Sequence, residues 1–478
     1  MEAAKHFIAG EWVGNGQGAE DINPSNTGDV VGVYGRADAH ETARAIGAAK
    51  QAFPAWSRSG VQQRHDILKK VGDEILARKD EIGRLLAREE GKTLPEAVGE
   101  TARAGQIFLF FAAECVRLAG EKLASVRPNI DIEVTREPIG VVGIITPWNF
   151  PIAIPAWKIA PALAYGNCVV FKPADLVPGT AHALSEIIAR SGIPPGVFNL
   201  VMGRGSVVGE TLLKHADIAG ISFTGSVATG RRIAADCIGG MKKFQLEMGG
   251  KNPLVVLDDA DLATAVECAV NGAFFSTGQR CTASSRLIVT QGIHDRFVQA
   301  MTARMKTLVI DDALKSGTHI GPAVDQSQLD QDLKYIEIGK QEGARLAAGG
   351  ATVKRDAPGY YLEPALFTDV RNDMRIAREE IFGPVAAVIR AKDYDEALAL
   401  ANDTEFGLAS GICTTSLKHA THFKRNAEAG MVMVNLPTAG VDYHVPFGGR
   451  KGSSYGPREQ GRYAAEFYTT VKTAYTLA

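Results

Sequence analysis

Closely spaced cysteines are missing from this sequence of 478 residues. No Cys-x-x-Cys pair occurs, and no histidine stands at metal-ligand spacing around a cysteine, which argues against a disulfide framework and against a zinc site. We therefore expect no metal, and we expect a reducing compartment, the cytoplasm. The six cysteines are Cys115, Cys168, Cys237, Cys268, Cys281 and Cys413.

An excess of charge of either sign is missing as well. Lysine and arginine number 52, aspartate and glutamate number 54, and the formal net charge is -2. The chain therefore lacks the excess of positive charge that would bind nucleic acid, and it has no acidic tail. We expect small molecules and further copies of the same chain as partners, and no nucleic acid.

A long uninterrupted hydrophobic run is the third absence. Residues 139–171 carry one charge, Lys158, over a length that would span a bilayer, but four prolines interrupt them. Because an unsupported membrane helix tolerates such breaks poorly, we interpret this segment as buried core beside an active site and expect no membrane partner. Residues 1–7 include an early acidic residue and no long apolar core, so we expect no signal peptide.

The sequence does contain a regular alternation of short apolar runs, turns and helical patterns. Turn signals in the first sixty residues suggest short strands and loops, and apolar residues recur at helical spacing from 61 to 90. After residue 142 the alternation predicts a parallel sheet with crossover helices, and a second round predicts a catalytic domain of similar architecture. The predicted strands are 141–146, 168–171, 197–201, 218–223 and 254–257 in the first round, and 286–290, 385–389 and 431–435 in the second.

Cys281 is the cysteine with an unusual setting. Free cysteines are mostly buried, so packing is the simplest interpretation of the other five. Cys281 follows the polar break Thr277-Gly278-Gln279-Arg280, between a predicted helix at 262–275 and the strand at 286–290, and a loop suits an accessible nucleophile. Arg280 could favour the thiolate if its side chain turns inward. The local sequence alone leaves nucleophile and packing equally open.

Two polar residues stand in apolar surroundings. Glu247 lies among apolar residues and precedes Gly249-Gly250; desolvation there would make it a stronger base, although a glutamate at a strand end is usually solvated. Asn149 lies between two aromatic residues, and by itself a turn cap before Pro151 is the better interpretation.

A strand-to-helix turn occurs at Ser222-Phe223-Thr224-Gly225-Ser226, with Gly225 at the bend and Ser226 at the start of a predicted helix, 227–237. Helix amino termini attract phosphate groups through free N–H groups and the helix dipole. The three-glycine fingerprint of dinucleotide-binding domains is absent. The turn alone is therefore a weak sign of a nucleotide site.

Seven segments, in the same order, resemble the aldehyde dehydrogenase superfamily, and the resemblance covers almost the full chain. It implies an α/β fold with a Rossmann-like doubly wound cofactor domain, an α/β catalytic domain and a small β oligomerisation element. The segments are Pro147-Trp148-Asn149-Phe150-Pro151, Phe171-Lys172-Pro173-Ala174, Phe223-Thr224-Gly225-Ser226, Leu246-Glu247-Met248-Gly249-Gly250, Gly278-Gln279-Arg280-Cys281, Glu379-Glu380-Ile381-Phe382-Gly383-Pro384 and Pro446-Phe447-Gly448-Gly449.

The resemblance also implies domain bounds and an oligomer. Arg127-Pro128-Asn129 could turn a hairpin, and the alternating tail at 467–475 is typical of a strand that needs a neighbour, so we expect a homodimer or homotetramer. The implied domains are an NAD(P)-binding domain at 1–119 and 139–247, a catalytic domain at 248–445, and an oligomerisation element at 120–138 and 446–478.

Three catalytic roles follow from the resemblance. Cys281 is expected to form a thioester from an aldehyde, and Glu247 to activate the water that hydrolyses it. Asn149, together with the Cys281 backbone N–H, is expected to stabilise the oxyanion. The presence of Glu247 argues against an enzyme that transfers the acyl group to coenzyme A. The presence of Cys281, Glu247 and Asn149 together argues against an inactive protein that only binds the nucleotide.

The resemblance implies cofactor contacts too. Lys172 matches the residue that contacts the adenosine ribose, and Glu380 matches the acid that holds the nicotinamide ribose. Asp175 stands where NAD-preferring members often have a glutamate, long enough to grip both ribose hydroxyls, so we expect a slight preference for NADP with use of NAD as well. The expected cofactor-binding residues are Trp148, Lys172, Asp175, Gly225, Ser226, Glu380 and Phe382.

Around residues 278–281 and over residues 435–449 the chain is similar to 2-oxoglutarate semialdehyde (2,5-dioxopentanoate) dehydrogenases. We expect Arg280 to bind a distal carboxylate. Succinic semialdehyde dehydrogenases tend to carry arginines where this chain has Trp157 and Phe275, and these aromatic side chains would also suit an aromatic or long aliphatic aldehyde. Succinate or glutarate semialdehyde and a broad specificity are further alternatives. The expected substrate-binding residues are Arg280, Trp157, Phe275 and His444.

Overall fold

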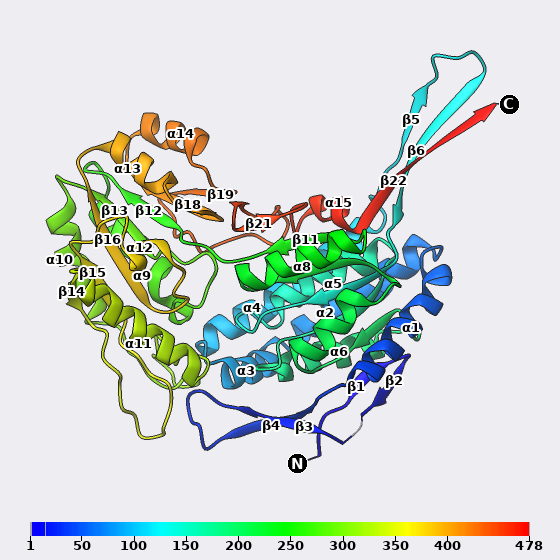
Figure 1. Cartoon of the computed structure of the whole chain (residues 1–478), viewed down its shortest axis with the longest axis horizontal. Helices are drawn as coiled ribbons and strands as arrows, with labels where there is room; N and C mark the ends of the chain where they lie inside the picture. The colour runs from blue at the N-terminus through cyan, green and yellow to red at the C-terminus, as the bar shows by residue number, and fades with distance from the viewer. Residues whose placement is uncertain (1, 15, 478) are drawn as a thin grey trace.

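The computed structural model describes residues 2–14 and 16–477. The chain folds into two open β-sheets, each flanked by helices, and a third sheet of three strands that protrudes from them (Figure 1). We call the part of the chain around the eight-stranded sheet the first lobe and the part around the seven-stranded sheet the second lobe. The three-stranded sheet, called the arm, extends away from both lobes (Figure 1). This arrangement confirms the predicted α/β fold class.

The sheet of the first lobe has the strand order β2-β1-β9-β8-β7-β10-β11-β21. The central strands, from β9 to β11 in that order, run parallel, and the edge strands pair antiparallel. The parallel strands are largely buried on both faces, which explains their continuous apolar runs. The strands are β1 His6–Ile8, β2 Glu11–Val13, β7 Val141–Ile145, β8 Cys168–Lys172, β9 Phe198–Leu200, β10 Ile218–Thr224, β11 Lys243–Glu247 and β21 Ser454–Tyr455.

The sheet of the second lobe has the order β14-β15-β16-β13-β12-β18-β19, parallel except for β14. The strand predicted at 254–257 lies here as β12, so its grouping with the first sheet is wrong. The chain crosses between the lobes directly after Glu247, in residues 248–252. The strands are β12 Pro253–Val256, β13 Arg286–Thr290, β14 Arg345–Ala348, β15 Ala365–Thr368, β16 Val385–Ala391, β18 Ala409–Cys413 and β19 Met431–Val434.

Helices flank both sheets (Figure 1). Those of the first lobe are α1 Ala39–Trp56, α2 Val61–Ala77, α3 Lys79–Glu90, α4 Leu94–Glu114, α5 Ala153–Ala164, α6 Pro178–Arg190, the π-helix η1 Gly205–Gly209, α7 Glu210–Lys214 and α8 Val227–Gly239. The helices after residue 261 in the chain are α9 Leu262–Phe274, the 3-10 helix η2 Phe275–Gly278, α10 His294–Met305, α11 Gln326–Gln341, α12 Arg375–Arg378, α13 Tyr394–Asn402, α14 Leu417–Asn426, the 3-10 helix η3 Arg462–Ala464 and α15 Ala465–Tyr468.

The expectation of only short strands and loops before residue 61 is wrong, because α1 lies there. The short strands β3 Gly18–Ile22 and β4 Val30–Gly35 precede it. The Asp38 carboxylate accepts from the Glu41 N–H at 2.8 Å, and the Asp38 N–H donates to the Glu41 carboxylate at 3.2 Å. This reciprocal capping box fixes the start of the helix, and the Asp-x-x-Glu spacing was its signal in the sequence.

The arm consists of β5 Glu121–Ala124, β6 Ile130–Pro138 and β22 Thr469–Leu477, in the order β22-β6-β5 and antiparallel (Figure 1). The predicted hairpin and the predicted tail strand are therefore confirmed, and the tail finds its neighbour, β6, in its own chain. Much of the apolar surface of the arm is exposed.

The segment between Pro446 and the arm connects the two lobes. Its strand β20, Arg450–Lys451, pairs with β17, Phe406–Gly407, beside the second lobe. Its next strand, β21, pairs with β11 at the edge of the first sheet. The residues after Pro446 therefore run past Glu247, the last residue of β11.

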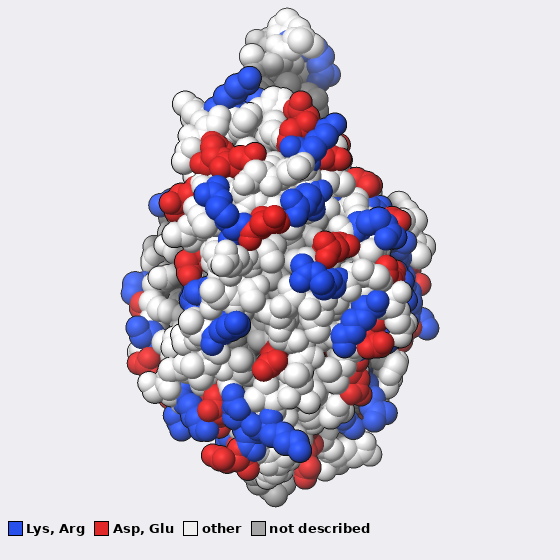
Figure 2. Space-filling view, turned by 90° about the vertical axis from the view of Figure 1, so that its left-hand side faces the viewer, with Lys and Arg blue, Asp and Glu red and all other residues white. Residues whose placement is uncertain are grey.

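The segment 139–171 contains β7, α5 and most of β8, and α5 is buried along its whole length. Within the described residues, no helix combines the length and the apolar character that crossing a bilayer requires. Lysine and arginine side chains are interspersed with aspartate and glutamate over most of the face shown in Figure 2, which agrees with the balanced composition.

Candidate active site

Cys281 lies where two cavities meet. One has a volume of about 370 Å³ and is lined largely by aromatic and aliphatic side chains; we call it the aromatic cavity. The other, of about 220 Å³, includes Gly225 and Ser226 at the start of α8, and we call it the glycine-turn cavity. Cys281 belongs to the lining of both, so it stands between them.

A tightly held turn presents Cys281. Ser276 and Thr277 have φ angles of 52° and 56°, in the left-handed region, and Gly278 follows with a φ of 66°. A Cβ atom at Gly278 would overlap the carbonyl of Gly383, so only glycine fits there. The predicted polar break is therefore a compact, buried turn rather than an open loop.

Side-chain hydrogen bonds hold this turn from other elements. The Glu96 carboxylate, in α4, accepts from the N–H and the hydroxyl of Ser276 at 2.8 and 3.1 Å. The Gln279 side-chain oxygen accepts from the Val324 N–H at 2.9 Å. Asn252 donates to the carbonyl of Cys281 at 2.7 Å. These contacts fix the backbone on which the sulfur stands.

Asn149 is positioned next to the same turn. Its Nδ2 donates to the carbonyl of Gln279 at 2.9 Å, and its own carbonyl accepts from Lys92 Nζ at 2.6 Å. Lys92 is buried and also pairs with Glu100 at 2.6 Å. The Asn149 amide is thus held rather than free, and it lines the glycine-turn cavity together with Cys281.

Glu247 is buried at the carboxyl end of β11. Burial raises the pKa of Glu247 well above its usual value of 4.5, the negative charge of Glu459 adds to the rise, and a hydrogen bond from Ser454 opposes it. Glu459 itself pairs with Lys158. A Cβ atom at Gly448 would lie 2.7 Å from a Glu247 oxygen, so glycine there lets the backbone approach the carboxylate.

The Cys281 thiol holds its proton firmly. Burial raises the pKa of Cys281 to about 12, and the negative charges of Glu380 and Glu247 add to it. The N–H groups of Cys281 and Thr282 oppose this rise. Arg280 donates instead to the carbonyls of Asn271 and Gly272. The hypothesis that Arg280 activates the sulfur is therefore not supported, because its guanidinium is engaged with α9.

Five of the predicted cofactor residues line the glycine-turn cavity: Trp148, Gly225, Ser226, Glu380 and Phe382. The rings of Trp148 and Phe382 meet edge to face, with centroids 5.3 Å apart. Glu380 accepts from the Gly250 N–H at 2.8 Å, and burial raises the pKa of Glu380 to about 7.

Lys172 and Asp175 lie outside the lining residues of this cavity. Lys172 is buried at the end of β8 and donates to the Pro173 carbonyl at 2.7 Å. Asp175 is exposed three residues further on. Lys172 is the last residue of β8, at the edge of the first sheet where the parallel strands end.

The glycine-turn cavity fits a nicotinamide nucleotide. It combines the amino terminus of α8, capped by Ser226, with aromatic walls and one carboxylate. The hydroxyl of Thr224, which also lines it, is buried without a hydrogen-bond partner in the described part of the chain. Such an unpaired group is available to a ligand.

The aromatic cavity holds three of the four predicted substrate residues, Trp157, Phe275 and Arg280. The Trp157 ring stacks on Phe447 with centroids 5.3 Å apart. His444 is not among the lining residues found in the described chain; its ring packs on Tyr443. The structure thus brings three of these residues together beside Cys281 and leaves His444 elsewhere.

Arg103 also lines the aromatic cavity and was not predicted from the sequence. It belongs to α4, and its guanidinium carbon lies 5.8 Å from the centroid of the Trp157 ring. The signal in the sequence was weak, because one arginine on a long helix is usually solvated.

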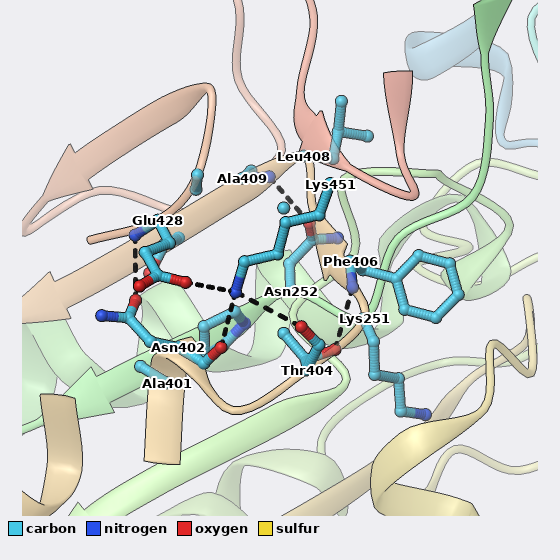
Figure 3. A pocket seen from close by; sticks show the side chains of 14 residues that line it. Lys251, Asn252, Ala401, Asn402, Thr404, Phe406, Leu408, Ala409, Glu428 and Lys451 are labelled. Atoms are coloured by element: carbon cyan, nitrogen blue, oxygen red, sulfur yellow. Dashed lines mark hydrogen bonds and ion pairs between the residues drawn. The ribbon is translucent and has the colours of Figure 1, made fainter. Parts of the chain in front are cut away.

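A third, water-sized cavity of about 10 Å³ lies at the start of β12 (Figure 3). Lys451 Nζ donates there to the carbonyl of Asn402 at 2.7 Å and pairs with Glu428 at 2.6 Å. Figure 3 also shows the Lys251 side chain pointing away from this cluster. The cavity is too small for a substrate, and Asn252 in its wall also donates to the Cys281 carbonyl.

The comparisons with known proteins agree with this geometry. The family model described as the aldehyde dehydrogenase family matches residues 12–474, and the chain belongs to that family. It is 45% identical to an alpha-ketoglutaric semialdehyde dehydrogenase of Bacillus subtilis, over 98% of this chain and 97% of that protein. It is 42% identical to a 2,5-dioxopentanoate dehydrogenase of Saccharolobus solfataricus, over 98% of both chains.

Solved structures are similar over the full chain. An NADP-dependent enzyme of E. coli matches with a TM-score of 0.96 and 37% identity, covering 100% of this chain and 98% of that one. A betaine aldehyde dehydrogenase of Staphylococcus aureus in complex with NAD+ matches with a TM-score of 0.97 and 34% identity, covering 100% and 95%.

Proposed function

We propose that this chain oxidises 2-oxoglutarate semialdehyde to 2-oxoglutarate with a nicotinamide dinucleotide as acceptor. The observation that carries the proposal is the place of Cys281 between the aromatic cavity and the glycine-turn cavity. A sulfur in this place can bind an aldehyde from one side and present it to a cofactor on the other. The relatives named for this semialdehyde support the choice of substrate.

The first step is addition of the Cys281 sulfur to the aldehyde carbon. Because the thiol is protonated at neutral pH, a base must take its proton as the bond forms, and we assign this to Glu247, whose charge acts on the sulfur. The negative charge that develops on oxygen is met by Asn149 Nδ2 and the Cys281 N–H. A nicotinamide bound in the glycine-turn cavity supplies the acceptor for the hydride that leaves the same carbon.

The second step is hydrolysis of the Cys281 thioester. After its first proton has passed to solvent, Glu247 takes a proton from a water molecule. The water oxygen attacks the acyl carbon, the C–S bond breaks, the Cys281 sulfur takes up the proton, and the acid is released. A carboxylate with a raised pKa is a stronger base than an exposed one. Retention of this base favours hydrolysis over transfer of the acyl group to coenzyme A.

For the cofactor we propose a slight preference for NADP, with use of NAD as well. Asp175 is one methylene shorter than glutamate and is exposed, so it leaves room for a 2'-phosphate near Lys172, a cation suited to that group. The NADP-dependent E. coli enzyme and the NAD+ complex of the S. aureus enzyme are both similar to this chain. Specificity constants with the two cofactors test this preference.

We also propose a homodimer or homotetramer assembled through the arm, in a reducing compartment such as the cytoplasm, where a free Cys281 thiol persists. The domains proposed are those expected from the resemblance, with residues 1–119 and 139–247 binding the cofactor, 248–445 carrying the catalytic turn, and 120–138 with 446–478 in the assembly.

A second candidate substrate class is an uncharged aromatic or long aliphatic aldehyde, which the aromatic rings of Trp157, Phe275 and Phe447 favour. A panel of aldehydes separates the two, with absorbance of the reduced nicotinamide followed in the presence and absence of coenzyme A. We expect the highest kcat/KM with 2-oxoglutarate semialdehyde and no requirement for coenzyme A. Strict dependence on coenzyme A, or a preference for uncharged aldehydes, would contradict the proposal.

A further inference from the structure

Two arginines line the aromatic cavity, and their side chains are engaged differently. Arg280 donates through Nη2 to the carbonyls of Asn271 and Gly272. Arg103 donates through Nη2 to the side-chain oxygen of Gln460 at 3.0 Å. The Arg280 guanidinium is therefore anchored to the backbone of α9, whereas Arg103 is held by a single neutral side chain.

Arg103 has hydrogen-bonding capacity left over. Its Nε is buried and has no hydrogen-bond partner among residues 2–14 and 16–477; the same holds for Arg280 Nε, but Arg280 is also anchored through Nη2 to two backbone carbonyls. A guanidinium carries five donors in a fixed fork, which matches the two oxygens of a carboxylate. An unpaired buried donor is costly unless a ligand satisfies it.

The charge of Arg103 is also uncompensated. Glu100 is the acid in α4 whose charge acts on Arg103, but it pairs with Lys92 at 2.6 Å and accepts from the N–H groups of Ile152 and Ala153. No salt bridge to Arg103 occurs within the described chain. Burial lowers the pKa of Arg103, and Glu100 and Asp442 only partly oppose this. An anion in the cavity would therefore find an unneutralised cation.

The guanidinium is fixed in place before any ligand binds. The Trp157 ring lies below it, with 5.8 Å between the guanidinium carbon and the ring centroid, and Trp157 in turn stacks on Phe447. Gln460 is fully buried, and because Arg103 can only donate, the oxygen of Gln460 must face it. A preorganised cation loses little freedom on binding an anion.

We propose that Arg103 binds the distal carboxylate of the aldehyde substrate, with Gln460 as the residue that positions its guanidinium. This inference rests on the proposed function, since it identifies the group that recognises the anionic end of that substrate. It replaces Arg280 as the principal partner of the carboxylate and explains how a cavity with Trp157 and Phe275 in its wall can select a charged aldehyde.

The kinetic test compares Arg103→Met with Arg280→Met on 2-oxoglutarate semialdehyde and on pentanal, an uncharged aldehyde of similar length. Arg103→Met is expected to raise KM for the semialdehyde on the order of 10- to 100-fold and to change KM for pentanal less than about 3-fold. Arg103→Lys keeps the charge and should restore part of the loss, and Gln460→Leu should raise KM for the semialdehyde with little change in kcat. Equal effects of Arg103→Met on both aldehydes would overturn the inference.

A binding measurement separates this inference from the proposed function. Isothermal titration of the wild-type protein with glutarate, a dicarboxylate of the same length, should give binding that Arg103→Met abolishes and Arg103→Lys partly retains. If glutarate binds in this way but the semialdehyde is not oxidised, the inference stands and the proposed function fails.

The opposite outcome is also distinguishable. If the semialdehyde is oxidised in preference to pentanal but Arg103→Met changes neither its KM nor glutarate binding, the proposed function stands and the inference fails. If the wild-type protein neither prefers the semialdehyde over pentanal nor binds glutarate, both the proposed function and the inference are overturned. Thermal unfolding of each variant shows that it is folded.

Discussion

The hydroxyl of Ser454 donates a 2.5 Å hydrogen bond to the carboxylate of Glu247, at the edge of the first sheet where β21 pairs with β11. This bond stabilises the ionised carboxylate, whereas burial and the charge of Glu459 favour the protonated form and raise the Glu247 pKa. The balance of these effects sets the pH at which Glu247 becomes a base.

Replacing Glu247 with glutamine should separate the two steps of the reaction. Glu247→Gln keeps the shape of the side chain but cannot accept a proton from water, so steady turnover should fall about 100-fold or more. A burst of reduced cofactor should remain, but slower than in the wild type, because the Cys281 thiol can still lose its proton to solvent. Stopped-flow absorbance at high enzyme concentration measures both phases. Unchanged steady turnover would remove Glu247 from its role.

Replacing Ser454 with alanine should shift the acid limb of the pH profile. Because the Glu247 pKa is raised, the rate of hydrolysis should fall with decreasing pH at a higher pH than an ordinary glutamate would give. Ser454→Ala removes an interaction that lowers this pKa, so the midpoint of the acid limb should move further upward. The pH dependence of kcat in both proteins gives the midpoints. A midpoint unchanged or shifted downward would show that the hydrogen bond does not tune the base.

The Cys281 thiol should react slowly with alkylating agents in the free protein. With a pKa of about 12, the thiolate fraction is small at neutral pH, and the rate of modification by iodoacetamide should keep rising from pH 8 to pH 11. Cys281→Ala is the matched control, since the other five cysteines are buried and should not be labelled. A rate that levels off near pH 8 would mean a more acidic thiol than this environment produces.

The sequence predicted the fold well where apolar runs were continuous. The strand predicted at 286–290 coincides with β13, because a strand buried on both faces contains an unbroken apolar stretch between turns. The placement of 254–257 failed for a different reason: strand patterns do not record which sheet a strand joins. Here the chain changes lobes in the five residues after Glu247.

Fewer features of the site than of the fold could be predicted from the sequence. Cys281 was conspicuous because a polar break precedes it, but Arg103 looks like any helical arginine until the fold brings it to Trp157 and to Gln460, 357 residues away in sequence. Such contacts are tertiary and leave no local pattern. His444 illustrates the converse, since a match within a motif did not bring its side chain into the lining of the aromatic cavity.

Removing the Asn149 amide should slow chemistry more than binding. Asn149→Ala deletes one of the two donors proposed for the oxyanion, so kcat should fall on the order of 100- to 1000-fold with a small change in KM. The Asn149 carbonyl still accepts from Lys92 in this variant, so the local backbone should persist. Steady-state kinetics and circular dichroism measure the two effects. A change confined to KM would assign Asn149 to substrate binding alone.

The arm should control assembly through its apolar face. Tyr475 pairs with Ile132 on β6, and Ile132 pairs with Leu123 on β5; residues directly opposite in a sheet share one face. Leu123, Val471 and Tyr475 are 48%, 56% and 60% exposed, and an apolar patch of this kind marks a protein interface.

Tyr475→Asp should therefore reduce the oligomer to a smaller species, because it would bury an unpaired charge in the interface. Light scattering after size exclusion measures the mass at several concentrations. Leu417→Asp is the matched control, since Leu417 is 80% exposed at the start of α14, which lies far from the arm (Figure 1), and an acidic residue is tolerated in the first turn of a helix. If both variants keep the wild-type mass, assembly does not depend on this face of the arm; if both lose it, the effect comes from added charge rather than from the arm.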